Sequence, residues 1–176
     1  MRFDELKTHG AYVIRSERHD DVRGYFETTF CQKEFERAGL IGHFVQSNVS
    51  FSNKRGTLRG MHFQEAPTAQ IKLVRCIHGA VYDVIVDLRA DSPTFCQWTG
   101  VELAAGSGTS LYVPRGFAHG FQTLADNSAV SYHMGDFYSP QHGRGVRWND
   151  ACFDIRWPVE TPILNERDAT YPDFTR

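Results

Sequence analysis

The feature that most constrains the fold is a central stretch of about 110 residues in which short apolar runs alternate with turn residues. Residues 71–89 form two β-rich runs separated by His78-Gly79, and residues 109–124 and 129–138 form further runs of the same kind. Short strands that are punctuated by glycine, proline and other turn residues are typical of sandwiches and barrels. The sequence therefore predicts an all-β protein built as a barrel.

Helical signals are sparse outside this stretch. Residues 31–40 have one, because Phe35 follows three polar residues and Gly39 supplies a stop. We expect the proline-rich residues 157–174 to wrap over the barrel. No repeat or linker divides the 176 residues, so residues 1–176 are expected to form a single domain. A chain of this length buries a sizeable core without disulfides or a structural metal.

Charge and composition exclude several classes of protein. Nineteen Lys and Arg face twenty-one Asp and Glu, a net charge of −2, which argues against a nucleic acid or a membrane surface as partner. No apolar run is long enough to span a membrane, and the first ten residues lack the apolar core of a signal peptide. The four cysteines include no Cys-x-x-Cys pair and are expected to be free thiols. We therefore expect a cytoplasmic protein.

A local motif points to one barrel family. Gly108 is followed at a distance by Pro114, Gly116 and His119, which resembles the second motif of the cupin superfamily. That resemblance implies a small jelly-roll barrel in which the turn aims His119 into the barrel mouth. A metal-binding cupin also needs two His at positions i and i+2 of its first motif, so that both rings share one strand face. His62 is followed at that distance by Gln64, so no metal is expected.

Residues suited to proton transfer occur on neighbouring predicted strands. His62 is a possible base, Arg59 a permanent cation and Lys72 an ammonium group. Tyr132 and Tyr138 are six residues apart, which would place both on one strand face if the strand extended that far. Removal of a proton beside a carbonyl group suits this set: His62 would take the proton, Lys72 would stabilise the enolate oxygen, and a tyrosine would return a proton.

With these residues the chain resembles the nucleotide-sugar 3,5-epimerases, typified by dTDP-4-dehydrorhamnose 3,5-epimerase. The similarity extends over nearly the whole chain. The segments that carry it are residues 21–26, 46–48, 58–64, 72–75, 117–121, 138–140 and 165–168. Each segment alone is only modestly specific for the family, but their order and spacing together are highly specific. The resemblance implies inversion of carbon 3, carbon 5 or both in a 4-keto-6-deoxyhexose linked to a nucleoside diphosphate.

The resemblance also implies residue roles. His62 matches the general base, Asp168 the carboxylate that orients it, Tyr132 the proton donor and Lys72 the cation near the carbonyl oxygen. The positions expected to hold or surround the substrate are Arg23, Thr28, Gln46, Asn48, Arg59, His119, Tyr138, Gly143 and Arg167. The family uses no metal or organic cofactor, and it forms homodimers by strand exchange in which the partner supplies some substrate contacts.

Four positions depart from the family pattern. Thr28 stands where the family usually has Glu, with Glu27 one residue earlier. Gln141 and Gly143 stand where the family has two carboxylates, and Arg167 replaces a Lys. These positions surround the substrate, so they leave open a CDP- or GDP-linked sugar, or inversion of one carbon only.

Other interpretations stay open at this stage. Asp168 lies three residues after Asn165, as in a helix-capping arrangement, and Lys72 alone would fit a solvated strand. A metal-dependent cupin enzyme and a catalytically inert cupin that binds a sugar nucleotide are the alternative classes. The joint presence of His62, Lys72, Tyr132 and Asp168 favours the epimerase.

Overall fold

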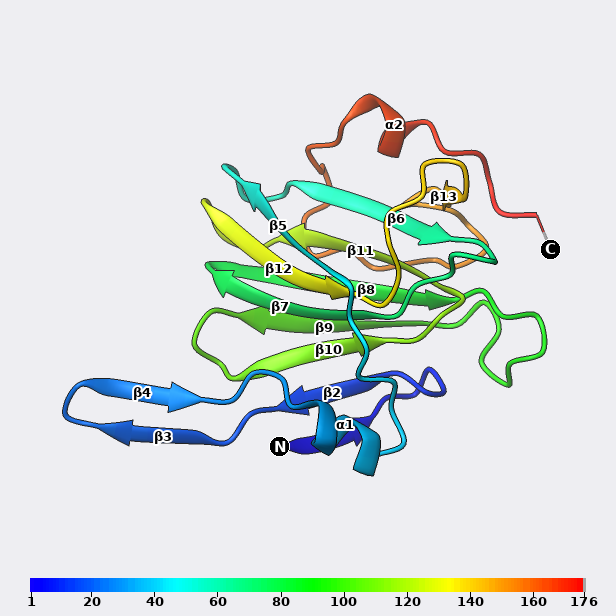
Figure 1. The fold of residues 1–176 in the computed structure, drawn as a ribbon. Helices are drawn as coiled ribbons and strands as arrows, with labels where there is room; N and C mark the ends of the chain where they lie inside the picture. The colour runs from blue at the N-terminus through cyan, green and yellow to red at the C-terminus, as the bar shows by residue number, and fades with distance from the viewer. Residues whose placement is uncertain (176) are drawn as a thin grey trace.

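A computed structural model describes residues 1–175 and shows thirteen strands and two short helices in that range (Figure 1). The strands are β1 (Arg2–Glu5), β2 (Tyr12–Arg15), β3 (Arg18–Asp21), β4 (Gly24–Glu27), β5 (Gln46–Ser52), β6 (Leu58–Gln64), β7 (Lys72–His78), β8 (Ala80–Asp87), β9 (Trp98–Ala104), β10 (Thr109–Val113), β11 (Phe117–Thr123), β12 (Ser128–Met134) and β13 (Gly143–Gly145). The helices are α1 (Gln32–Arg37) and α2 (Glu166–Ala169).

Two antiparallel sheets face each other. One has the order β1-β2-β10-β7-β12-β5 and the other the order β13-β6-β11-β8-β9, while β3 and β4 form a separate hairpin that projects from the body (Figure 1). Neighbours in each sheet are often distant in the chain, as in a jelly roll. The predicted all-β, cupin-type jelly roll with a few short helices is confirmed.

The main core lies between the two sheets. Val74 of β7 and Leu111 of β10 meet Ile85 of β8 and Phe121 of β11 there, and all four are buried. Strand alternation turns Val84 and Val86 of β8 to the other face of their sheet, where Phe153 and Ile155 of the C-terminal segment cover them. Trp157 and Phe174 pack against the same cluster, which confirms the expectation that residues 157–174 wrap over the barrel (Figure 1).

Strand and helix boundaries follow the turn residues. Gly79 has a φ of 71° between β7 and β8, which glycine adopts without strain and which confirms the predicted turn. The predicted helix exists as α1, buries Phe35, and ends before Gly39. Strand β12 ends at Met134, so the idea that Tyr132 and Tyr138 share one strand face is wrong. The chain leaves the sheet after Gly135, where the backbone of Asp136 and Tyr138 bonds to glutamine side chains instead of a strand.

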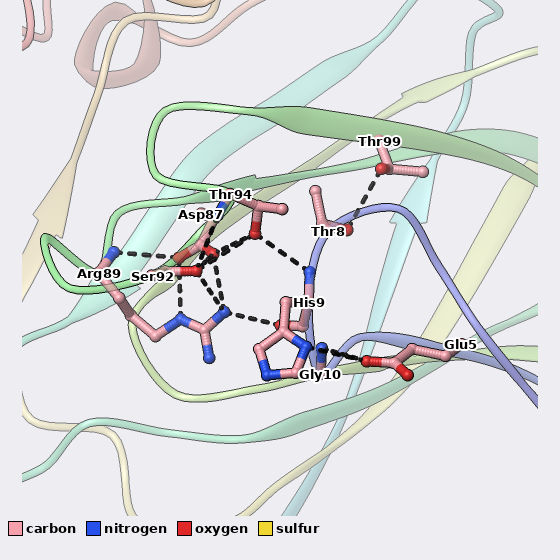
Figure 2. Close-up of polar contacts among 9 residues, drawn as sticks. All are labelled: Glu5, Thr8, His9, Gly10, Asp87, Arg89, Ser92, Thr94 and Thr99. Carbon is pink, nitrogen blue, oxygen red and sulfur yellow. Dashed lines mark hydrogen bonds and ion pairs between the residues drawn. The ribbon is translucent and has the colours of Figure 1, made fainter.

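A polar network joins the β8–β9 connection to the β1–β2 turn (Figure 2). The buried carboxylate of Asp87 accepts hydrogen bonds from Arg89, Ser92 and Thr94. Arg89 also donates to the backbone oxygen of His9 at 2.7 Å. Burial would raise the pKa of Asp87, but these hydrogen bonds outweigh it and lower the pKa to about 2. The network thus fastens the N-terminal strands to the barrel.

Two further observations concern residues 1–175. Within that range no helix combines the length and the apolar character that crossing a membrane requires. No disulfide joins the four cysteines, all of which lie in that range, and Cys76 is buried in the main core.

Candidate active site

A bulge in β6 brings Arg59 and His62 to one face of the sheet. Two residues three positions apart point to opposite faces of a regular strand. Here His62 pairs with His119 of β11 and Arg59 with Phe121, so β6 has one residue more than its partner over this stretch. Gly60 lies in the bulge with a φ of 128°, and a Cβ there would lie 2.6 Å from the Cα of Gly120. Glycine is therefore required at position 60.

The bulge also places a carboxylate against His62. Nε2 of His62 lies 2.7 Å from Oδ1 of Asp168, and the backbone N–H of Gly60 donates to Oδ2 at 3.0 Å. Burial favours a raised pKa for Asp168, but the hydrogen bond and charge of His62 and the Gly60 N–H lower it below the usual value. The ionised carboxylate thus accepts the Nε2 proton of His62, which leaves Nδ1 as the basic nitrogen.

The capping interpretation of Asp168 is also confirmed. Asn165 caps α2, and its side-chain oxygen accepts the backbone N–H of Asp168 at 2.7 Å. The side chain of Asp168 nevertheless points to His62 rather than to solvent, and it is 1% exposed. The short helix therefore positions the carboxylate, and the two interpretations describe one arrangement.

Lys72 and Tyr132 come from the sheet that faces His62. Lys72 begins β7 and Tyr132 lies in β12, whereas His62 lies in β6 of the other sheet (Figure 1). Nζ of Lys72 donates to the backbone oxygen of His62 at 3.3 Å. Burial raises the pKa of Tyr132, so its phenol keeps its proton at neutral pH. An imidazole and a protonated phenol therefore lie on opposite walls of the barrel, and the amino group of Lys72 lies beside the imidazole residue.

A buried His119–Asp83 pair lies next to Lys72. Nε2 of His119 is 2.9 Å from Oδ1 of Asp83, and Asp83 is fully buried. Burial lowers the pKa of Lys72 to about 8, against the opposing charge of Asp83, which keeps the pKa from falling further. Burial likewise lowers the pKa of His119 more than Asp83 raises it, so His119 is neutral at pH 7.

Two adjoining cavities enclose these groups. They measure about 320 Å³ and 160 Å³, and His62, Lys72 and Tyr132 line both. Of the predicted site residues, the larger cavity also contains Gln46, Asn48, Tyr138, Gly143 and Arg167, and the smaller contains Arg59, His119 and Asp168. No carboxylate lines the larger cavity among the described residues, whereas Arg144 joins Lys72 and Arg167 there. This distribution of charge favours an anionic ligand.

Two predicted site residues lie outside both cavities of this chain. Arg23 is in the β3–β4 turn, where its side chain is 86% exposed and pairs with Asp21. Thr28 follows β4 and is exposed. Glu27, one residue before Thr28, pairs instead with Arg75 of β7. The hairpin that carries Arg23 projects away from the cavities, so this chain alone does not bring Arg23 to the site.

Several site residues were not anticipated from the sequence. Asp83 interrupts the apolar run of β8, and a carboxylate among apolar strand residues is a recognisable sign of a buried acid. Asn165 lines the smaller cavity in addition to capping α2. Gln70, Met134 and Arg144 line the larger one, and no local motif marks Gln70 or Met134. Within residues 1–175, no group of three or more His, Cys, Asp and Glu side chains could hold a metal ion.

The fold and the site together define a class: a cupin-type jelly-roll enzyme equipped for proton transfer on an anionic ligand. Comparison with known proteins narrows this class. A family model described as dTDP-4-dehydrorhamnose 3,5-epimerase matches residues 5–176. The chain belongs to the dTDP-4-dehydrorhamnose 3,5-epimerase family, whose members are isomerases.

Individual relatives are similar to this chain along almost its full length. The dTDP-4-dehydrorhamnose 3,5-epimerase of Sinorhizobium fredii is 43% identical over 175 residues, 99% of this chain and 90% of that protein. The Shigella flexneri enzyme of the same name is 49% identical over 155 residues, 88% of this chain and 85% of that protein. The crystal structure of the Bacillus anthracis enzyme with TDP and PPi bound is similar with a TM-score of 0.95. It is 45% identical, and the match covers 98% of this chain and 99% of that one.

Proposed function

We propose that this protein converts dTDP-4-dehydro-6-deoxyglucose to dTDP-4-dehydrorhamnose by inverting carbons 3 and 5. The observation that carries the proposal is the placement of His62 and Tyr132 on facing sheets around shared cavities. Inversion of a carbon requires that a proton leave one face and return at the other. A base and an acid on opposite walls supply the two faces.

The proposed reaction uses the 4-keto group of the sugar. A hydrogen on carbon 3 or 5 becomes acidic because the ketone converts the carbanion to an enolate. Nδ1 of His62 takes this proton, and Asp168 stabilises the imidazolium that forms. The ammonium of Lys72 stabilises the enolate oxygen, an interaction that contributes a few kcal/mol in a site that excludes water. Tyr132 then donates its proton to the opposite face.

The nucleotide is proposed to occupy the larger cavity. Its lining contains Arg144 and Arg167 for the diphosphate and the exposed ring of Tyr138 for stacking. Gln46, Asn48 and Gly143 line the same cavity, and Arg59 and His119 line the smaller one, in which we place the sugar. No metal or organic cofactor takes part in the proposed reaction.

Solvent exchange in heavy water tests the reaction. The wild-type protein would receive 4-keto-6-deoxyglucose linked to dTDP, CDP or GDP, with a His62→Ala variant as control. Deuterium at carbons 3 and 5 of the dTDP sugar, absent with the control variant, is the expected result. Deuterium at one carbon, or a preference for CDP or GDP, would replace the proposal by a narrower epimerase. No exchange with any of the three would refute it.

We further propose that two copies of the chain form a dimer in which Arg23 of each copy enters the partner's site. The β3–β4 hairpin that carries Arg23 projects from the body and exposes Val22 and Phe26 (Figure 1). Strand β5 is an edge strand that exposes Val49 and Phe51. Exposed apolar side chains on an unpaired edge strand favour pairing with another chain. The same arrangement would bring Thr28 near the substrate.

A complementation experiment distinguishes this dimer from other assemblies. Arg23→Ala and His62→Ala variants are inactive separately if both residues are needed. In a co-expressed mixture, half of the dimers are hybrids with one intact site, so about a quarter of the wild-type activity should return. A chain that sediments as a monomer, or a mixture that stays inactive, would contradict the proposal.

The cytoplasmic location remains a prediction.

A further inference from the structure

The segment of residues 136–139, which follows β12 and contains Tyr138, is held by the side chains of three glutamines. Gln70 donates Nε2 to the backbone oxygens of Asp136 at 2.9 Å and Phe137 at 3.2 Å. Gln64 donates to the Phe137 oxygen at 3.3 Å and accepts the Ser139 N–H at 2.8 Å. Gln46 accepts the Tyr138 N–H at 3.1 Å. These amides take the place of a neighbouring strand.

Side-chain packing does not fix Tyr138 in the same way. Its side chain is 55% exposed, and that of Phe137 is 64% exposed. Gln64 and Gln70 are buried, at 6% and 7% exposed, so their amides bond to the protein rather than to water. Gln70 bonds to the segment alone, and Gln64 bonds to the segment and to the backbone oxygen of Thr68 at 2.8 Å. Apart from an interaction of its hydroxyl with Arg167, the position of the Tyr138 ring therefore depends on the backbone that the glutamines hold.

Each glutamine lies two residues from a residue of the proposed site. Gln64 follows His62 in β6, Gln46 precedes Asn48 in β5, and Gln70 precedes Lys72 at the start of β7. Residues two apart on a strand point to the same face, which applies to the pairs in β5 and β6. Gln70 lies just before β7, and all six of these side chains line the larger cavity. The segment that carries Tyr138 is thus tied to the same strands that position the base and the ammonium group.

We propose that Gln64 and Gln70 are positioning residues that set the Tyr138 ring against the nucleotide part of the substrate. This inference rests on the proposed function for its substrate. Neither glutamine reacts with the sugar, so their loss weakens binding of the sugar nucleotide and leaves the proton-transfer step nearly unchanged.

The test compares Gln64→Met and Gln70→Met with a matched control, Gln122→Met. Gln122 is fully buried, bonds to the backbone oxygen and N–H of Val159 at 2.8 and 2.9 Å, and lines neither cavity. Gln70→Met and Gln122→Met each lose two bonds to the backbone, and Gln64→Met loses three. We expect Gln64→Met to raise KM about tenfold with kcat within about threefold of wild type, and Gln122→Met to leave both nearly unchanged. An equal KM rise in the control would overturn the proposal.

Two further measurements separate this proposal from its premise. In a Tyr138→Ala background, Gln64→Met should raise KM by less than about twofold, because the residue that it positions is absent. A full tenfold rise there would contradict the proposal. Cleavage by chymotrypsin after Phe137 or Tyr138 needs no substrate, and it should be faster in Gln64→Met than in Gln122→Met. Equal cleavage rates would refute the role of the glutamine, whereas a wild-type protein inactive on every sugar nucleotide would refute the proposed function alone.

Discussion

Replacement of Lys72 by methionine should stabilise the protein and abolish its activity. The ammonium group is buried, and its pKa falls from 10.5 to about 8. At about 1.4 kcal/mol per pH unit, this difference corresponds to about 3 kcal/mol of destabilisation by the buried charge. Methionine has a similar length and carries no charge. Since Asp83 loses a neighbouring cation in the variant, we expect a net gain of about 1–3 kcal/mol at pH 7.

The pH dependence identifies the cause. The pKa of Lys72 is lower in the folded state than in the unfolded state, so the folded protein binds fewer protons between pH 8 and 10.5. Wild-type stability therefore rises relative to the variant as the pH increases through this window. The gain in the free energy of unfolding from Lys72→Met should be complete below pH 8 and should shrink toward pH 10.5.

Urea unfolding at pH 7 and pH 10 measures the effect, at one protein concentration because an oligomer would make stability depend on concentration. Lys33→Met is the matched control, since Lys33 is exposed on α1 and its loss should change stability by less than about 0.5 kcal/mol. The rate of epimerisation should fall about a hundredfold or more in Lys72→Met. A variant that is less stable than wild type at pH 7, or a difference that does not vary with pH, would refute the reasoning.

Three further predictions follow from the site and the fold. Asp168→Asn should lower kcat about a hundredfold with little change in KM, because His62 loses the carboxylate that orients it and stabilises its charge. Steady-state kinetics measure both constants, and an unchanged kcat would contradict the role of Asp168. Tyr132→Phe should still exchange deuterium at the reacting carbon but should form inverted product about a hundredfold more slowly, since only return of the proton to the second face is lost. NMR in heavy water measures exchange and inversion separately. Inversion at the wild-type rate would argue against Tyr132 as the acid. Asp87→Asn should lower the free energy of unfolding by about 1–2 kcal/mol at pH 7, and this difference should disappear as the pH falls from 3.8 to about 2, because the carboxylate stabilises the fold only while it is ionised. Acid titration of both proteins checks it, with the exposed Asp154→Asn as control, and a constant difference would be inconsistent with the network in Figure 2.

Short sequence patterns predicted much of the fold. The turn at Gly79, the stop at Gly39 and the strands on either side of Gly116 depend on residues close together in the chain, so alternation and turn chemistry predicted them. The extent of β12 was harder to foresee, because the strand ends where its neighbours β5 and β7 stop pairing with it. That boundary decided that Tyr138 lies beyond the sheet.

The sequence by itself determined the fold class and which side chains are available for chemistry. The tertiary structure decided how they meet. The bulge at Gly60 turns Arg59 and His62 to one face, although their spacing alone predicts opposite faces. Asp83 meets His119, and Gln64 and Gln70 meet the segment of residues 136–139, through contacts between distant parts of the chain. Such contacts depend on the register between strands and on packing of the two sheets, which no short stretch of sequence encodes.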